Sequence, residues 1–184
     1  MLEFDNLKSS LEEFRDAVIA DAKRNLKSQD KVASGGLSDG IVGQDVIVYP
    51  SGSLYFEITM PLYGFFVDKG VSGVNQKYNT PYSYKRKGGQ NSLKGMPPPS
   101  KLDKWIVRKG IGRRGKGKGK FTSRKTLQFL IARSIFFKGF KPSLFFTKPF
   151  EKHYSKLPEV LAKSYGLDIE KFIQAQFIHS RQKA

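Results

Sequence analysis

The stretch DNLKSSLEEFRDAVIADAKRNLKSQ, residues 5–29, has the clearest periodic pattern in the chain. Its apolar residues recur at steps of three and four and its charged residues fill the opposite face, as in an amphipathic α-helix. The apolar positions are Leu7, Leu11, Phe14, Val18, Ala22 and Leu26. We therefore expect a helix over 5–29 with one buried face and with Asp5 or Asn6 as its N-cap.

Directly after this helix the composition changes twice. Residues 34–40, SGGLSDG, have the chemistry of turns. Two β-branched or aromatic runs follow, over residues 45–49 and 54–60, with PSGS between them at 50–53. Short runs of this composition on either side of a turn predict a β-hairpin.

Farther along the chain, residues 72–100 show little periodicity and are rich in Gly, Asn, Ser and Pro. A loop of this length is uncommon in a compact domain unless it is functional or contacts a partner. The remaining elements that we expect are a short helix after Ser100 as its cap, a helix over 122–138 ending at Gly139, a strand over 140–146, a helix over 150–164 and a last helix capped by Asp168.

The composition limits the possible classes of protein. The chain has 184 residues, 33 Lys plus Arg against 16 acids, two His and no Cys. This length suits a single domain, which we expect over 1–184. The lack of cysteine excludes disulfides, thiolate nucleophiles and Cys-bearing zinc or iron–sulfur sites. The sequence shows neither a signal-peptide pattern nor an apolar run of membrane-spanning length, so we expect a soluble protein with no membrane partner.

The positive charge is concentrated in one region. From Lys85 to Lys125 the sequence has fifteen cations and one acid, Asp103, a net charge of +14, which leaves +3 for the rest of the chain. The predicted DNA- or partner-contacting residues are Lys85, Arg86, Lys87, Arg108, Lys109, Arg113, Arg114, Lys116, Lys118, Lys120, Arg124 and Lys125. Alternating Gly and Lys over 115–120 are suited to following phosphates without reading bases. Two alternatives to phosphate contact are contact with an acidic protein surface and a solvated loop whose charge only aids solubility.

Several catalytic patterns are present only in part. Residues 110–115, GIGRRG, match G-x-G-x-x-G, but the expected strand, helix and acid around them are missing, and Gly117 stands where a P-loop needs Ser or Thr. Glu57 and Asp68 read better as a strand position and a turn residue than as converging acids. His153 and His179 have no neighbouring carboxylate pattern. We therefore expect no enzyme activity, no cofactor and no metal site.

One combination of motifs is more specific. Residues 63–71, YGFFVDKGV, resemble the "tyrosine, small residue, aromatic, valine, acid, glycine" signature of phage neck and tail-completion proteins. Residues 97–110, PPPSKLDKWIVRKG, and 139–145, GFKPSLF, follow in the order found in that family. The sequence departs from the family's pattern at Asp68, where Glu is usual, and in the long basic segment 72–125.

The resemblance implies a structural virion protein, assembled in the host cytoplasm as part of a homo-oligomeric ring between portal and tail. It implies an α+β fold in which an N-terminal helix and further helices pack on a small antiparallel sheet of about four strands. Residues 72–125 would be a basic insertion and 165–184 a C-terminal helical extension. Portal, adaptor or tail proteins and genomic double-stranded DNA would be the partners.

The chain also has more aromatic residues than one small core needs, and such a surplus is typical of subunit interfaces. The predicted interface residues are Tyr63, Phe65, Phe66, Asp68, Phe140, Phe145, Phe146 and Phe150, with Asp68, Gly64 and Gly70 shaping a turn. A location of these aromatics in the core is the alternative. The rival to the neck protein is a free-standing basic nucleic-acid-binding protein, which would normally be basic over all of its folded faces.

Overall fold

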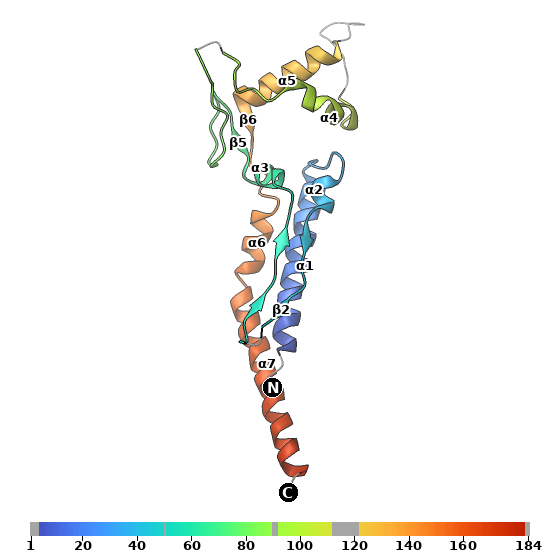
Figure 1. Ribbon diagram of the computed structural model, residues 1–184, viewed down its shortest axis with the longest axis vertical. Coiled ribbons are helices and arrows are strands. Elements are labelled where there is room, and N and C mark those ends of the chain that lie inside the picture. The colour runs from blue at the N-terminus through green and yellow to red at the C-terminus, as the bar shows by residue number, and fades with distance from the viewer. Residues whose placement is uncertain (1–3, 50, 90–91, 112–121, 183–184) are drawn as a thin grey trace. The chain divides into compact units, whose positions relative to one another are not determined.

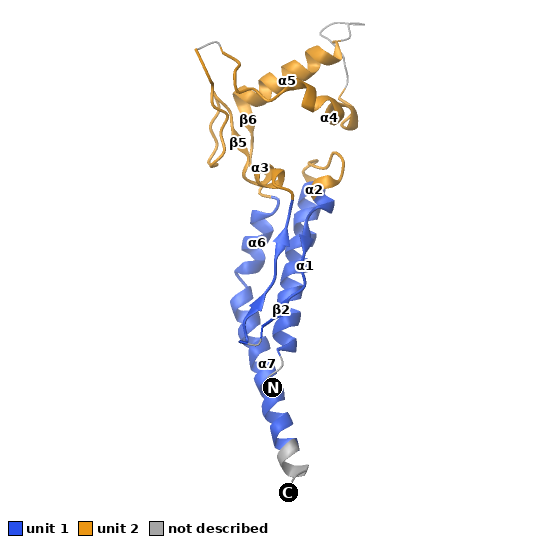
Figure 2. Cartoon of the chain, in the orientation of Figure 1, with its two compact units in different colours: residues 1–27, 38–60, 145–184 blue, residues 28–37, 61–144 orange. Residues whose placement is uncertain are grey.

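The computed structural model describes residues 4–49, 51–89, 92–111 and 122–182. The chain divides into two compact units, coloured separately in Figure 2. Unit 1 comprises residues 1–27, 38–60 and 145–184, and unit 2 comprises residues 28–37 and 61–144. Helices are combined with short antiparallel strands (Figure 1), so the predicted α+β class is confirmed. Among the described residues, no helix is both long and apolar enough to cross a membrane.

Unit 1 is built on the predicted N-terminal helix, α1 (Asp5–Ser28), which runs antiparallel to α6 (Thr147–Tyr154) and α7 (Leu157–Gln182). Three contacts give the register: Asn6 with Asp168, Ser10 with Ser164, and Asp21 with His153. Residue numbers rise along α1 while those of its partners fall along α7 and α6, as expected for antiparallel helices. The predicted apolar face of α1 is the buried one from Leu11 to Leu26.

The predicted hairpin packs one face on α1. β2 (Ile47–Val48) pairs with β3 (Leu54–Tyr55), and β1 (Val42–Gly43) pairs with β4 (Ile58–Thr59). The register shifts by one residue between the two ladders, as in a β-bulge. Phe56 meets the ring of Phe14 edge-on, with centroids 6.1 Å apart, and Arg15 donates to the Gln44 carbonyl oxygen at 2.7 Å.

The core of unit 1 lies between α1, the hairpin and the start of the C-terminal helices. Phe145 is completely buried. It was predicted as an interface residue, but its ring is enclosed by its own chain, so the core alternative holds for this position. The other buried apolar side chains are Leu11, Phe14, Val18, Ala22, Leu26, Ile41 and Val46.

Asp168 has a different role from the predicted one. It does not begin a helix, because α7 runs unbroken from 157 to 182, and the predicted boundaries at 164 and 165 lie within it. Its carboxylate instead accepts hydrogen bonds from the backbone N–H groups of Asn6 and Leu7, both at 3.0 Å, and from the Asn6 amide at 2.7 Å. A side chain on α7 therefore caps the first turn of α1, where the N–H groups have no partner within the helix.

Unit 2 contains α3 (Tyr63–Lys69), β5 (Val71–Ser72), η1 (Pro99–Leu102), α4 (Asp103–Arg108), α5 (Arg124–Lys138) and β6 (Gly139–Phe140). A four-residue helix, α2 (Gly36–Asp39), spans the point in the sequence where unit 2 ends and unit 1 resumes. β5 pairs with β6, which sets Val71 opposite Phe140 and Ser72 opposite Gly139. The described part of 73–98 has isolated bridges only, consistent with the predicted long loop.

The β5–β6 ladder depends on glycine. A Cβ on Gly73 would lie 2.2 Å from the Phe137 carbonyl oxygen, and one on Gly139 would lie 2.0 Å from the Val71 carbonyl oxygen. Both neighbours are backbone atoms that cannot move aside. Gly139 also has φ +67°, which favours glycine. The two segments can approach this closely only without side chains at these positions.

Helix α5 ends at Lys138 as predicted and begins at Arg124, two residues after the predicted start at 122. The Ser123 hydroxyl accepts from the Thr126 N–H at 3.1 Å as N-cap of α5, and Gly139 is its C-cap. Helix η1–α4 packs against α5. Ser100 lies inside η1, so its predicted role as a cap is wrong.

Two further predictions for unit 2 are wrong. Residues 140–146 form no continuous strand, because Pro142 has no N–H to donate and Leu144 has φ +50°. Gly64 and Asp68 lie within α3 rather than in a turn, and Asp68 is buried. Gly70, at φ +71°, supplies the change of direction after this helix.

We expect Asp168→Ala to lower the free energy of unfolding by about 1–3 kcal/mol, because two backbone N–H groups lose a buried acceptor. Urea unfolding followed by circular dichroism measures the change. Glu170→Ala, on the exposed side of the same turn, is the matched control and should change stability by at most about 0.5 kcal/mol. Equal effects of the two substitutions would contradict the capping role.

The same cap predicts a pH dependence. Burial alone would raise the pKa of Asp168, but the hydrogen bonds from Asn6 and Leu7 outweigh it and hold the pKa below its usual value. The carboxylate therefore stabilises the fold above its unfolded-state pKa of about 3.9, and this stabilisation is lost as the pH falls through the lower folded-state pKa. The difference in unfolding free energy between the natural chain and Asp168→Asn should be constant above about pH 5 and shrink below about pH 4. A difference that grows on acidification would contradict it.

Candidate functional site

The two units differ sharply in charge. Unit 2 has 21 Lys and Arg against three acids, a net charge of +18, whereas unit 1 has 12 against 13, a net charge of −1. Residues 85–125 supply +14 of this charge, and the other residues of unit 2 supply +4. A unit this basic attracts a polyanion at long range. Unit 2 is the candidate functional site.

The three acids of unit 2 are already in contact with cations. Lys109 Nζ lies 2.6 Å from Asp30 Oδ1 and also donates to the Asp30 carbonyl oxygen. Arg124 Nη2 donates to Asp103 Oδ2 at 2.9 Å, which ties α5 to α4. Lys69 Nζ lies 3.9 Å from Asp68 Oδ2. Of the predicted contact residues, Lys109 and Arg124 therefore hold the fold together.

Arg86 is also engaged with the protein. Its guanidinium lies over the ring of Phe137 at 5.6 Å from the centroid, and Arg133 lies at the same distance from that ring. Two cations on one ring are held by cation–π attraction. Arg133 was not among the predicted contact residues, and no local pattern marks it.

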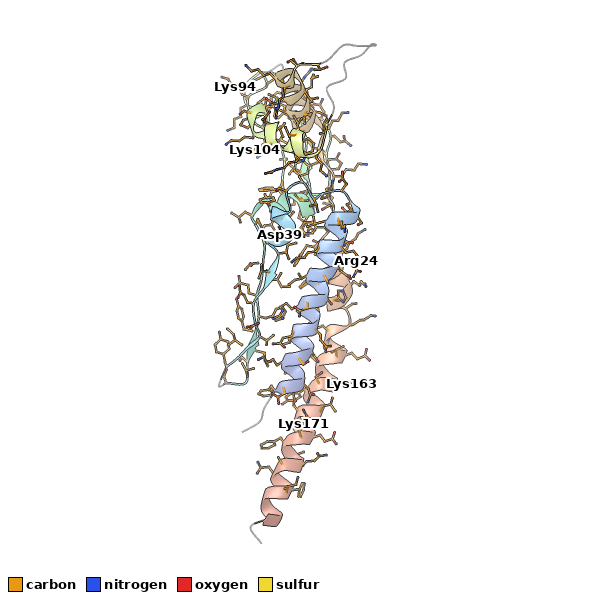
Figure 3. The ribbon with its side chains drawn as sticks, turned by 90° about the vertical axis from the view of Figure 1, so that its right-hand side faces the viewer. Arg24, Asp39, Lys94, Lys104, Lys163 and Lys171 are labelled. Carbon is orange, nitrogen blue, oxygen red and sulfur yellow. The ribbon has the colours of Figure 1, made fainter. Side chains whose placement is uncertain are left out.

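The remaining described cations face solvent. From the predicted set these are Lys85, Lys87, Arg108 and Lys125. Lys94, Lys101 and Lys104 are exposed in the same unit, and Figure 3 shows Lys94 and Lys104 at its surface. Arg113, Arg114, Lys116, Lys118 and Lys120 lie outside the described residues. The exposed cations come from the loop before η1, from η1–α4 and from the start of α5.

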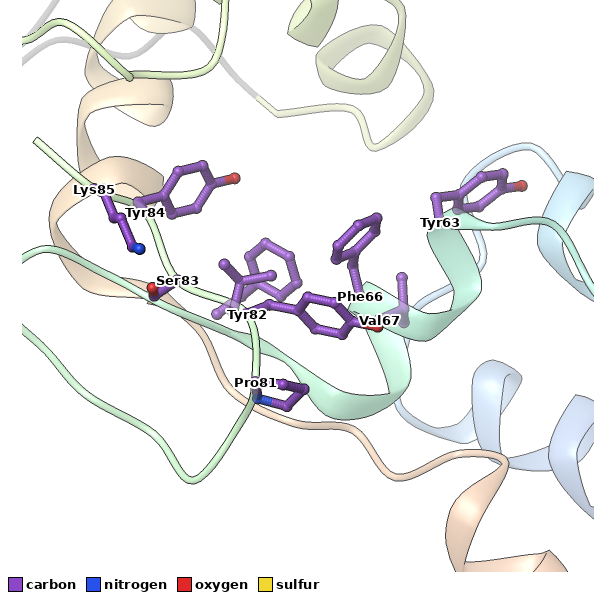
Figure 4. A pocket seen from close by; sticks show the side chains of 10 residues that line it. Tyr63, Phe66, Val67, Pro81, Tyr82, Ser83, Tyr84 and Lys85 are labelled. Carbon is purple, nitrogen blue, oxygen red and sulfur yellow. The ribbon is translucent and has the colours of Figure 1, made fainter. Parts of the chain in front are cut away.

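An aromatic groove of about 680 Å³ lies in the same unit (Figure 4). It is lined by Tyr63, Phe66, Val67, Val71, Pro81, Tyr82, Ser83, Tyr84, Lys85 and Phe140. Phe66 and Tyr82 meet edge-to-face with centroids 4.5 Å apart, and burial raises the pKa of the Tyr84 hydroxyl. The groove offers apolar contact, tyrosine hydroxyls and one amine, that of Lys85.

The groove brings together part of the predicted interface set. Tyr63 and Phe66 come from α3 and Phe140 from β6, which pairs with β5. Tyr82 and Tyr84 were not predicted, because their place opposite α3 depends on a long loop with no periodic pattern. Phe65 is on α3 but does not line the groove, and it is about two-fifths exposed.

Of the other predicted interface residues, Asp68 is buried in α3 of unit 2, and Phe145, Phe146 and Phe150 lie in unit 1. Phe150 stacks on Phe146 and on Tyr154, with centroids 6.1 and 5.6 Å apart, and meets Phe14 edge-on. This aromatic row runs along α6. The predicted interface residues therefore form two separate groups, one in each unit.

The residues considered for catalysis do not converge. Glu57 belongs to unit 1 and accepts from the Tyr55 hydroxyl at 3.1 Å, whereas Asp68 belongs to unit 2. His153 Nε2 lies 3.0 Å from Asp21 Oδ2, and this contact, with that of Lys152, lowers the pKa of Asp21. His153 thus joins α6 to α1. The described residues contain no cluster of three His, Asp or Glu able to hold a metal ion, and the His179 side chain is outside the description.

Comparison of the chain with protein-family models, with characterised proteins and with solved structures finds no match.

The division between exposed and paired cations can be tested on DNA. We expect Lys85→Ser combined with Lys87→Ser to weaken binding to a short duplex and to flatten the plot of log affinity against log salt by about 0.9 per lost phosphate contact, with unchanged stability. Lys109→Ser should instead lower stability, because the ion pair and carbonyl contact at Asp30 are lost. Fluorescence anisotropy at several salt concentrations and thermal unfolding measure the two effects. An unchanged slope in the double variant would contradict a role in phosphate contact.

Proposed function

We propose that this chain is a structural, non-enzymatic subunit of a phage neck, one copy in a multimeric ring between portal and tail that completes the head–tail joint. In this proposal aromatic residues of both units carry the subunit contacts, and the basic unit 2 also contacts genomic double-stranded DNA or a neighbouring ring protein. The ring is part of the virion and is assembled in the host cytoplasm.

The observation that carries the proposal is the separation of charge between the units. A protein that coats nucleic acid is usually basic over most of its surface, whereas unit 1 has a net charge of −1 and unit 2 of +18. In a ring, each copy adds its unit 2 to a common electropositive collar. Such a collar attracts the phosphate backbone by counterion release and without reading bases, as a DNA channel requires.

The arrangement of the family-like motifs supports the same function. The signature over 63–71 and the closing element over 139–145 are about 70 residues apart in sequence, yet they meet in the β5–β6 ladder. Glycine is needed at this junction on steric grounds. Two of the three motifs that carry the resemblance therefore lie side by side in the structure.

The chemistry of the described residues also favours binding over catalysis. Asp30 and Asp103 neutralise cations, and Asp68 is buried next to Lys69. Each acid of unit 2 thus has a structural role. The many exposed amines and guanidinium groups are suited to contacting phosphates or carboxylates.

The alternative function is that of a free-standing nucleic-acid-binding protein, for which the positive charge of unit 2 would be sufficient. The mass of the protein in solution distinguishes a ring subunit from such a free-standing protein. A monomer that binds duplex DNA tightly with a steep salt dependence, and that never enters particles, would favour this alternative.

Replacing Arg113, Arg114, Lys116, Lys118 and Lys120 by Ser tests the proposed role in particles. We expect the variant to fold normally but to impair particle assembly or DNA retention, because the collar loses five positive charges per copy. Counting DNA-filled, tailed particles by electron microscopy measures the effect.

The matched control replaces five lysines of unit 1 by Ser, namely Lys23, Lys27, Lys148, Lys156 and Lys163. It should leave DNA retention unchanged. Normal particles from the unit 2 variant would show that the strip contacts nothing important, and absence of the natural chain from purified particles would refute the neck assignment itself.

A further inference from the structure

The aromatic groove of unit 2 has an open strand edge along one wall. Ser72 of β5 donates its N–H to the Tyr82 carbonyl oxygen and accepts from the Tyr84 N–H, both at 2.8 Å, so residues 82–84 extend the β5–β6 pair by a short third segment. The backbone groups of Ser83 therefore point away from β5. Among the described residues neither of these groups has a hydrogen-bond partner, and Ser83 lines the groove. Such an unpaired edge is a template for a further strand.

Both walls of the groove are held in place by the rest of unit 2. The Thr80 hydroxyl donates to the Gly70 carbonyl oxygen at 2.9 Å and accepts from the Tyr82 N–H, which fixes the start of the open wall. On the opposite wall, the Ser143 hydroxyl donates to the Val67 carbonyl oxygen of α3 at 2.6 Å. A site that is formed in advance loses little conformational freedom when it is occupied.

The aromatic part of the groove suits an apolar side chain better than a nucleic-acid base. Tyr63 is 50% and Phe66 42% exposed, so both rings offer apolar surface to a ligand. The Phe66 and Tyr82 rings meet at an interplanar angle of 62°, and therefore do not form the parallel faces between which a flat base stacks.

The groove is also suited to a carboxylate. Among the described lining residues Lys85 is the only charged one, and it is exposed and has no ion-pair partner in the described part of the chain. Figure 4 shows Lys85 and Tyr63 at opposite ends of the groove. Residues 69–102, which include the open wall, have seven Lys and Arg and no acid. Lys87 and Lys94 lie directly opposite each other across an antiparallel bridge, where like charges repel. A carboxylate of a bound partner would offset this repulsion.

The occupant is expected in a different protein. The described extended segments of unit 2 are themselves basic, and those of unit 1 are paired with each other in the β1–β4 and β2–β3 ladders. An occupant of the groove has to bring both a carboxylate and an unpaired backbone.

We propose that the groove binds an extended segment of a partner protein, which adds to the sheet at Ser83, packs an apolar side chain against Phe66 and Tyr82, and places a carboxylate beside Lys85. Because side chains alternate along a strand, the apolar and acidic residues of this segment should occupy alternate positions. The inference refines the proposed function and rests on it only for the identity of the partner. Tyr63, Phe66 and Phe140 would then contact a neighbouring ring protein rather than a second copy of this chain.

Random peptides displayed on yeast test this inference, with the labelled full-length chain as the target at physiological salt. Cells are sorted for binding to the natural chain and against binding to Phe66→Ala. We expect enrichment of peptides whose apolar residues alternate with polar ones and that have at least one Asp or Glu in the apolar register. No enrichment, or enrichment of peptides that lack this pattern, would overturn the inference.

Fluorescence anisotropy then gives the affinity of a labelled synthetic peptide from the enriched set. We expect Phe66→Ala to weaken binding about tenfold or more, because an apolar wall is lost, and Lys85→Gln about threefold to tenfold, because the amine is lost. Phe65→Ala is the matched control, since Phe65 is the neighbouring residue of α3, is equally exposed at 42% and does not line the groove. It should bind as the natural chain does, and equal losses in the two phenylalanine variants would contradict the assignment.

Methylation of the peptide's backbone nitrogens provides a test that leaves the protein unchanged. Methyl groups on the nitrogens that face Ser83 remove the donor to its carbonyl oxygen and should weaken binding about tenfold or more. Methylation at the intervening positions should have a smaller effect. Equal affinities of the two methylated peptides would overturn the addition to the sheet edge.

Two other occupants are outcomes of the same measurements, and either would overturn the inference. A single-stranded thymidine oligonucleotide that displaces the peptide, and that binds Phe66→Ala more weakly than Phe65→Ala, would assign the groove to bases. A solution mass that falls to that of the monomer in Phe66→Ala but not in Phe65→Ala would assign it to a second copy.

Failure of this inference can be told from failure of the proposed function. A chain that is present in purified tailed particles but binds no peptide would overturn the groove's role and leave the neck assignment standing. Peptide binding by the purified protein, together with particles that lack the chain, would do the reverse.

Discussion

Unit 1 depends on the hydrogen bonds between the Asp168 carboxylate and the first turn of α1. They place a buried acceptor on two N–H groups that the helix cannot satisfy, and they fix the register of α1 against the C-terminal helices. With that register, Ser10 meets Ser164 and Asp21 meets His153 farther along. The same register determines how much of α7 has a helical partner and how much extends past the beginning of α1.

Electrostatics in unit 2 operates at two levels. A few cations are used inside the unit, where Asp30, Asp103 and the ring of Phe137 hold them. The larger number faces solvent, where no acid of the unit is left to neutralise them. The acids of this unit therefore pair with its own cations, and most of its positive charge is exposed to a binding partner. Screening by salt should affect that partner's binding more than the fold.

Elements whose signal is local could be predicted from the sequence. The stripe from Leu11 to Leu26, the hairpin around residues 50–53 and the capped helix ending at Gly139 each have their pattern within a few residues. The misassigned elements depend on distant contacts. Residues 140–146 resemble a strand, but Pro142 cannot donate to a ladder, and the N–H groups of Ser143 and Leu144 donate instead to the carbonyl oxygens of Val67 and Asp68 at the end of α3.

The candidate site divides in the same way. The excess of Lys and Arg is visible in the sequence, but the pairing of Lys109 with Asp30 spans 79 residues and cannot be read from spacing. Asp168 looked like a local helix cap because aspartate is common there, yet it caps a helix more than 160 residues away. Tyr82 and Tyr84 reach the groove beside Phe66 through backbone hydrogen bonds to Ser72 of β5, which accepts from the Tyr84 N–H and donates to the Tyr82 carbonyl oxygen.

The crowding at Gly73 and Gly139 has a consequence for tracing ancestry. A buried side chain can drift through other apolar residues while its neighbours adjust, but a carbonyl oxygen about 2 Å from where a Cβ would lie permits no such drift. Gly70, with its left-handed backbone, adds a third position of this kind. We therefore expect distant relatives to keep glycine at these three positions, with the same spacing, even where most of their other residues differ.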